Sequence, residues 1–149
     1  MNLSESNNIK VVKTDDGNAC LEIRRKVFID EQNVPTELEI DDYDRSNSEC
    51  EHFLITDNGA IVGTFRLIYD SPELAHMQRL CVLPEMRGKG YGYAAMSFLK
   101  EECKKRGNSK ITLGAQCHAI PFYESCGFVC VSDVFLDAGI EHRTMECVL

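Results

Sequence analysis

The sequence predicts a mixed α/β fold in which helices pack on one central sheet. Apolar patterns typical of strands and of amphipathic helices succeed one another in the order β-α-β-β-β-α-β-α-β-β. The chain has 149 residues, which is close to the size of one domain and long enough to bury a full core. We therefore expect a single domain over residues 1–149.

The first elements are a short strand and a helix. The run Ile9-Lys10-Val11-Val12-Lys13 suits a strand, and Asp15, Asp16 and Gly17 interrupt it and can cap the next element. Residues 18–29 place Leu21, Ile23, Val27 and Phe28 at helical spacing, and Pro35 ends any continuous element.

A hairpin and a third strand occupy the middle of the chain. Residues 51–57 and 60–69 are apolar, β-rich runs that flank Asn58-Gly59, the strongest two-residue hairpin signal. Ser71-Pro72 turns the chain, and residues 74–83 form a further strand that ends at Pro84.

The C-terminal half alternates helices and strands. A helical stretch to about residue 106 carries an apolar stripe, and Gly107 with Asn108 suits a C-terminal cap. The next helix contains Pro121, which is tolerated in the first turn. The remaining expected elements are a strand over 110–115, the helix over 119–126, and strands over 127–133 and about 141–148.

The net charge is concentrated in one part of the chain. The formal net charge is −8, which argues against a nucleic-acid binder with a basic footprint. Residues 30–51, which we call the acidic segment, hold nine acidic residues and the single base Arg45. The acidic segment thus accounts for the whole net charge.

The eight cysteines are expected to be reduced thiols. The first ten residues are polar and contain no apolar signal-peptide core, and no Cys-x-x-Cys pair suggests a zinc or redox motif. No apolar stretch approaches the ~20 residues that span a bilayer. We expect a cytoplasmic protein without a metal and without a membrane or nucleic-acid partner.

The most informative motif is Arg87-Gly88-Lys89-Gly90-Tyr91-Gly92, which joins a strand to a helix. Such a turn binds anions, because unpaired N–H groups and the helix dipole meet there and glycine lets phosphate approach the backbone. The spacing fits neither a Walker A loop nor a Rossmann fingerprint.

Two segments resemble one protein family. Arg87-x-x-Gly90-x-Gly92 after Leu80-Cys81-Val82-Leu83-Pro84 is similar to the acetyl-CoA loop of the GNAT superfamily of N-acetyltransferases. Residues 119–128, Ala-Ile-Pro-Phe-Tyr-Glu-Ser-Cys-Gly-Phe, resemble a second family segment. Residues 25–35, 115–119 and 137–145 resemble its ElaA-like/YjcF-like branch. The resemblance implies a mostly antiparallel, twisted sheet of six or seven strands, splayed at strands 4 and 5, with about four flanking helices.

The resemblance also implies a cofactor site for acetyl-CoA. The pyrophosphate is expected on the backbone amides of the glycine loop, and pantetheine along the strand that ends at Val82. The residues expected to contact the cofactor are Leu80, Cys81, Val82, Arg87, Gly88, Lys89, Gly90, Tyr91, Gly92, Tyr93, Gln116, Phe122 and Tyr123.

Acetyl transfer to an amine needs an oxyanion donor, a general acid and a general base. The N–H of Cys81 or Val82 suits the first role. By resemblance Tyr123 is the acid, and its unperturbed pKa of about 10 keeps it protonated at neutral pH. The base is open among Glu31, Glu39, Asp41, His76, His118 and His142, with Glu31 and His142 retained as candidates. An acyl-cysteine route through Cys81, Cys117 or Cys126 is disfavoured, because the family transfers directly in a ternary complex.

The acidic segment has two interpretations. In the family it borders the acceptor, so Glu39 and Asp41, together with His118, are expected to contact an ammonium substrate; otherwise it is a solvated loop. The predicted activity is transfer of an acetyl group to a primary amine of a small molecule or peptide. A CoA-binding regulatory module without turnover is the alternative, and a homodimer is left open.

Overall fold

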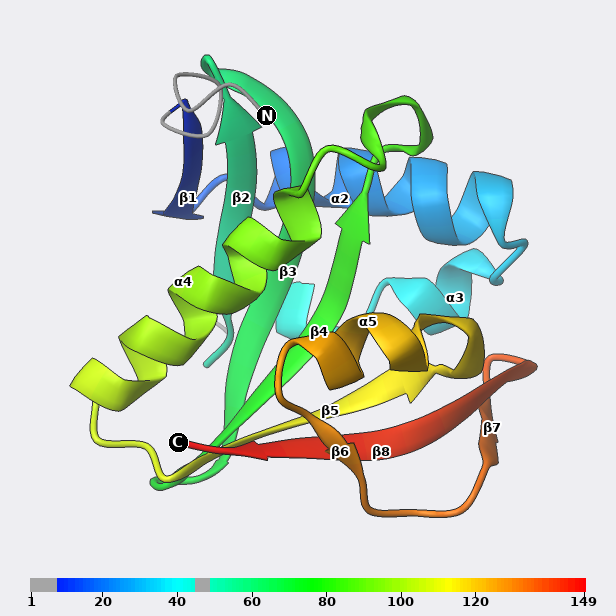
Figure 1. Cartoon of the computed structure of the whole chain (residues 1–149). Helices are drawn as coiled ribbons and strands as arrows, with labels where there is room; N and C mark the ends of the chain where they lie inside the picture. The colour runs from blue at the N-terminus through cyan, green and yellow to red at the C-terminus, as the bar shows by residue number, and fades with distance from the viewer. Residues whose placement is uncertain (1–7, 45–48) are drawn as a thin grey trace. The chain divides into compact units, whose positions relative to one another are not determined.

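The computed structural model describes residues 8–44 and 49–149, whose helices and strands are labelled in Figure 1. The chain divides into two compact units. The first unit contains the residues through Arg66 together with Arg79–Ala95, and the second contains Leu67–Gln78 and Met96–Leu149. Arg45, the single base of the acidic segment, lies outside the described residues.

The first unit begins with a strand and a helix, as predicted. Its elements are β1 (Ile9–Thr14), α2 (Gly17–Arg24), η1 (Arg25–Glu31), α3 (Thr36–Glu39), η2 (Asp42–Asp44), β2 (Glu51–Asp57) and η3 (Pro84–Met86). Asp16 caps α2, because its carboxylate accepts a hydrogen bond from the N–H of Ala19 at 3.2 Å. The expected helix over residues 18–29 is thus two helices in sequence, of which η1 is a π-helix.

Three elements pass from one unit to the other. They are β3 (Ala60–Ser71), β4 (Leu74–Val82) and α4 (Tyr91–Lys105). The second unit adds β5 (Lys110–Gln116), η4 (Cys117–Ala119), α5 (Ile120–Ser125), β6 (Val129–Cys130), β7 (Phe135–Asp137) and β8 (Ile140–Val148).

The strands form one mixed sheet in the order β1-β2-β3-β4-β5-β8-β6, with β7 paired to β8. The pairs β1/β2, β5/β8, β6/β8 and β7/β8 are antiparallel. In the parallel pair β4/β5, Leu74–His76 lie opposite Lys110–Thr112. The later residues of β4, from Arg79 on, belong to the first unit, whereas all of β5 belongs to the second. The predicted mixed α/β fold is confirmed, and the described part of the chain forms eight strands instead of the expected six or seven.

The C-terminal strands differ from the prediction for a local reason. Of the strand expected over residues 127–133, only Val129 and Cys130 form β6, and the N–H of Val131 still donates to the carbonyl of Thr144 at 2.9 Å. The hydroxyl of Ser132 then accepts from the N–H of Thr144 at 2.8 Å, which replaces a backbone partner of the ladder. The chain returns as β7, and Ala138 and Gly139, with φ of 51° and 78°, form the two-residue turn into β8.

Each unit has its own buried side chains. In the first unit Phe53 and Phe65 stack with ring centroids 4.8 Å apart, and Ile23, Val27, Cys81 and Leu83 form one cluster. In the second unit the most buried apolar side chains include Ala75, Met96, Leu99, Ile111, Leu113 and Met145. Among the described helices, none has the length and apolar composition needed to cross a membrane.

Candidate functional site

The predicted glycine loop forms an open turn at the N-terminus of α4. Gly88 and Gly90 adopt φ of 79° and 86°, a region that favours glycine, and a Cβ on either residue would meet no atom within 4 Å. Helix α4 begins at Tyr91, its first turn contains no acidic residue, and its first internal bond runs from Ala94 N–H to Gly90 C=O at 3.0 Å. The loop therefore has the room, the amide groups and the helix dipole that an anion site requires.

Tyr91 secures the start of α4 within the first unit. Its side chain is 3% exposed, and its hydroxyl donates a hydrogen bond to Asp57 at the end of β2. The predicted contact of Tyr91 with the cofactor can therefore involve only its backbone, because its ring is buried and its hydroxyl is engaged. Lys89 and Tyr93, by contrast, are exposed.

Arg87, the first residue of the glycine loop, is held by two other segments. Its Nη1 and Nη2 donate to the two carboxylate oxygens of Glu31 at 2.7 and 2.6 Å, and its Nε donates to the carbonyl of Val82 at 3.2 Å. Hydrogen bonding to Glu31 raises the pKa of Arg87 above its ordinary value. The structure thus joins a predicted base candidate to a predicted cofactor residue.

The end of β4 lies very close to β3. A Cβ on Gly63 would stand 2.6 Å from the carbonyl oxygen of Cys81, so a side chain at Gly63 would push the two strands apart. Cys81 is 6% exposed, and burial raises the pKa of its thiol far above the ordinary value. A thiolate nucleophile at Cys81 is therefore disfavoured at neutral pH. Burial also raises the pKa of Cys126.

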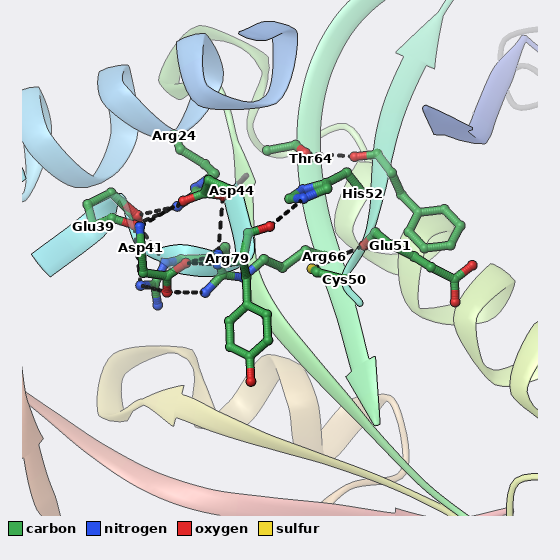
Figure 2. A network of polar contacts seen from close by, with 12 residues as sticks. Arg24, Glu39, Asp41, Asp44, Cys50, Glu51, His52, Thr64, Arg66 and Arg79 are labelled. Atoms are coloured by element: carbon green, nitrogen blue, oxygen red, sulfur yellow. Dashed lines mark hydrogen bonds and ion pairs between the residues drawn. The ribbon is translucent and has the colours of Figure 1, made fainter. Parts of the chain in front are cut away.

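Three arginines and three carboxylates form a connected polar network in the first unit (Figure 2). Its members, which we call the arginine–carboxylate cluster, are Arg24, Glu39, Asp41, Asp44, Arg66 and Arg79. They come from α2, α3, η2, β3, β4 and the turn between α3 and η2. The opposite charges are equal in number, so the cluster as a whole is neutral.

The centre of the cluster is Asp44. Arg24 donates to both of its carboxylate oxygens, Arg66 Nη1 donates at 3.2 Å, and the N–H of Asp41 donates at 3.0 Å. Burial acts to raise the pKa of Asp44, but the hydrogen bonds from Arg24 and Asp41 and the charges of both arginines lower it below the ordinary value. Asp44 is therefore a carboxylate throughout the neutral pH range.

Glu39 and Asp41, both predicted to contact the acceptor, have arginine partners as well. Glu39 is 2% exposed and lies 2.7 Å from Arg79 Nε and 3.3 Å from Arg24 Nη2. Asp41 accepts from Arg66 Nη1 and Nη2 at 2.7 and 2.6 Å. Arg79, with φ of 61°, is a left-handed residue inside β4, and its guanidinium also reaches Asp41 at 3.6 Å.

Much of the negative charge of the acidic segment is therefore balanced by ion pairs in the folded protein. In addition to the cluster and the Glu31–Arg87 pair, Glu51 pairs with Lys13 at 3.1 Å. Five acidic residues of the segment thus meet five bases that lie outside it in the sequence. These roles of Arg24, Arg66 and Arg79 were not predicted from the sequence. A signal was present, since an arginine within an apolar helix face or strand must be paired once it is buried.

The second unit contains Tyr123, the predicted general acid. Tyr123 lies in α5, is 8% exposed, and packs edge-on against Phe122 and Phe128 at centroid distances of 5.0 and 6.0 Å. Its carbonyl accepts from the N–H groups of Cys126 and Phe128. Two aromatic side chains thus pack against the ring of Tyr123.

Gln116 and His142 face each other across β5 and β8 in the second unit. His142 is 8% exposed, stacks on Phe135 with centroids 5.9 Å apart, and holds its Nδ1 2.7 Å from the carbonyl of Ile140. A carbonyl only accepts, so Nδ1 carries the hydrogen and Nε2 of the neutral ring has the lone pair.

The other predicted histidines differ from His142. His118 is exposed in η4, and His76 lies 3.2 Å from the carboxylate of Asp70. In residues 8–44 and 49–149, no three or more His, Cys, Asp or Glu side chains are arranged so that they could hold a metal ion.

Comparisons with known proteins agree on one family. Residues 13–149 match the model of the acetyltransferase (GNAT) domain. The chain is 38% identical over 124 residues to the uncharacterized N-acetyltransferase YjcF of Bacillus subtilis, and the match covers 83% of this chain and 86% of that protein.

Solved structures show the same fold. The crystal structure of Escherichia coli ElaA has a TM-score of 0.80 and 30% identity, and the match covers 93% of this chain and 99% of that chain. A GNAT family acetyltransferase from Elizabethkingia anophelis with acetyl-CoA bound has a TM-score of 0.68 at 15% identity, over 96% of this chain and 99% of that chain. At this identity the second likeness shows the fold alone.

Proposed function

Because the chain belongs to the GNAT acetyltransferase family, in its ElaA-like/YjcF-like branch, we propose that it transfers the acetyl group of acetyl-CoA to a primary amine. Family membership implies the acetyl-transfer chemistry, and the acceptor is proposed to be a small molecule or a peptide. The observation that carries the proposal is the open glycine loop at the N-terminus of α4, where the amides and the helix dipole suit a pyrophosphate.

The residues around the loop fit a cofactor of this kind. The space around Gly88 and Gly90 is open, no carboxylate lies in the first turn of α4, and the exposed Lys89 adds positive charge. Acetyl-CoA supplies an acetyl group activated as a thioester. The backbone N–H of Cys81 or Val82 is proposed to stabilise the charge that develops on the carbonyl oxygen.

Two side chains are proposed to move protons. The hydroxyl of Tyr123 donates its proton to the departing thiolate of CoA, as its place in the second family segment implies. Among the base candidates, His142 is favoured, because its Nδ1–H bond to Ile140 leaves the lone pair of Nε2 to accept a proton from the attacking amine. Glu31 is a weaker candidate, since both of its oxygens accept from Arg87.

The direct test is an amine panel with acetyl-CoA, read by mass spectrometry. We expect acetylation of at least one class among polyamines, amino sugars, aminoglycosides and lysine peptides. Tyr123→Phe keeps the ring packing on Phe122 and Phe128 and is expected to lower kcat by about 100-fold. Tyr69→Phe, at a tyrosine whose hydroxyl accepts from Arg106, is the matched control.

Two outcomes would contradict the enzyme proposal. One is CoA binding without turnover of any amine, which would favour the regulatory module. The other is wild-type activity in Tyr123→Phe, which would remove the proposed acid. A thiol-reagent assay is unsuitable, because eight cysteines would react as well.

A further inference from the structure

We propose that Glu31 is a positioning residue for the glycine loop: it holds Arg87 as a brace between η1 and β4, so that the loop amides, and not the Arg87 guanidinium, bind the pyrophosphate. The inference rests on the proposed cofactor site. It assigns a role to an ion pair that links a predicted base candidate to the first residue of the loop.

The geometry of Arg87 supports a brace. One guanidinium makes three hydrogen bonds, two to Glu31 at the end of η1 and one to the Val82 carbonyl at the end of β4. All three of its nitrogens thus have a partner inside the first unit. These bonds use three of the five guanidinium N–H groups, and a phosphate that bound through the same groups would displace two short charge-assisted bonds.

A buried apolar cluster lies between the elements that carry Glu31 and Arg87. Val27 of η1 belongs to the same buried cluster as Cys81 and Leu83, and Phe28 and Met86 pack against that cluster. The backbone is bonded at the same place, from Leu83 N–H to Val62 C=O at 2.9 Å and from Met86 N–H to Leu83 C=O at 2.9 Å. Glu31 and Arg87 therefore lie at the ends of elements, η1 and η3, that contact the same buried cluster.

The loop itself needs such support. Arg87 has extended backbone angles, and Gly88 and Gly90 come after it in left-handed conformations with open space around them. Two glycines within three residues leave many conformations accessible to the free loop. The bonds of the Arg87 guanidinium to Glu31 and to the Val82 carbonyl hold the first residue of the loop in place. The bond from Tyr91 to Asp57 holds the residue within the loop at which α4 begins.

The direction in which Glu31→Gln changes CoA affinity distinguishes a positioning role of Glu31 from a purely electrostatic one. Glu31 is negatively charged and lies near the proposed site for the CoA pyrophosphate, which is also negatively charged. If Glu31 acted only through its charge, Glu31→Gln should strengthen CoA binding. If Arg87 is a direct ligand that Glu31 restrains, Glu31→Gln should also strengthen binding. Only a positioning role predicts that loss of the acidic charge weakens the binding of an anion.

The experiment is a double-mutant cycle on CoA affinity, measured by calorimetry with the full chain. We expect Glu31→Gln and Arg87→Gln each to weaken binding by about fivefold, the factor that corresponds to about 1 kcal/mol for an exposed ion pair. The double variant should be no weaker than the single variants, because both changes break the same pair. Glu102→Gln, in the partly exposed pair between Glu102 of α4 and Arg106 just beyond the helix, is the control and should bind as the wild type does.

A second measurement does not depend on CoA. Hydrogen exchange of the free protein should show faster deuterium uptake in the peptide covering residues 83–94 for both variants, since the bonded amides of Met86 and Ala94 flank the loop. Tighter or unchanged CoA binding in Glu31→Gln would overturn the inference. Unchanged exchange in both variants would do so as well.

The two proposals fail in different ways. A wild-type protein that does not bind CoA refutes the proposed function, and the exchange experiment still decides whether Glu31 and Arg87 position the loop. A wild-type protein that binds CoA while Glu31→Gln binds more tightly refutes only the brace.

Discussion

Asp44 is the residue of the arginine–carboxylate cluster whose substitution should cost the most stability. Its side chain is 5% exposed, and Arg24 and Arg66, each 2% exposed, both donate to it. Asp44→Asn keeps the size of the side chain but leaves Arg24 with Glu39 and Arg66 with Asp41 as single carboxylate partners. Removing one member of a buried ion pair costs about 3–5 kcal/mol.

The loss should also depend on pH with a definite sign. The pKa of Asp44 is lowered in the folded protein, so its stabilising contribution is complete above the unfolded-state pKa of about 3.9 and is lost as the pH falls through the folded value. The stability advantage of the wild type over Asp44→Asn should therefore shrink as the pH falls from 5 to 3.

The assay is urea denaturation followed by circular dichroism at a series of pH values. At neutral pH a loss of this size corresponds to a fall in Tm of roughly 10 °C for a chain of this length. Glu51→Gln, in the more exposed pair with Lys13, is the control and should cost less than about 1 kcal/mol. A cost below about 1 kcal/mol for Asp44→Asn, or a cost that does not change with pH, would refute this account of the cluster.

Three further predictions concern the proposed activity. Gly88→Ala should weaken CoA binding measured by calorimetry and cost about 1–2 kcal/mol of stability, because the φ of Gly88, 79°, is left-handed. Gly88→Asn should bind CoA more tightly than Gly88→Ala does, since asparagine tolerates this backbone conformation better. Equal CoA affinities of the two variants would contradict the backbone argument. His142→Gln should lower kcat in an acetyl-transfer assay by about 100-fold, and an unchanged kcat would exclude His142 as the base. Glu37→Gln with Asp42→Asn should raise the acceptor KM for a cationic amine by about twofold without changing CoA affinity, and an unchanged KM would leave the exposed part of the acidic segment without an acceptor role.

The prediction of the fold succeeded because its signals are local. Asn58-Gly59 forms the turn between β2 and β3, Pro84 comes just after the end of β4, and Gly107 with φ of 81° lies just beyond α4. Each depends on backbone preferences of one or two residues. The two segments that resemble the family are also continuous in sequence, so family membership could be predicted without any tertiary information.

Local patterns failed where tertiary contacts override them. The strand expected over 127–133 ends early, because the Ser132 side chain takes a ladder bond from Thr144, twelve residues away. Helices α3 and η2 within the acidic segment were not predicted. Their carboxylates are held by Arg24, Arg66 and Arg79, which belong to other elements.

The sequence by itself determined the fold class, the family and the position of the glycine loop. It also determined that the whole net charge of −8 falls within residues 30–51. Only the tertiary structure decided what that charge does, because ion pairing depends on distance in space. Five of the nine acids meet bases from outside the acidic segment, and one of these pairs, Glu31 with Arg87, reaches the loop that the sequence had singled out.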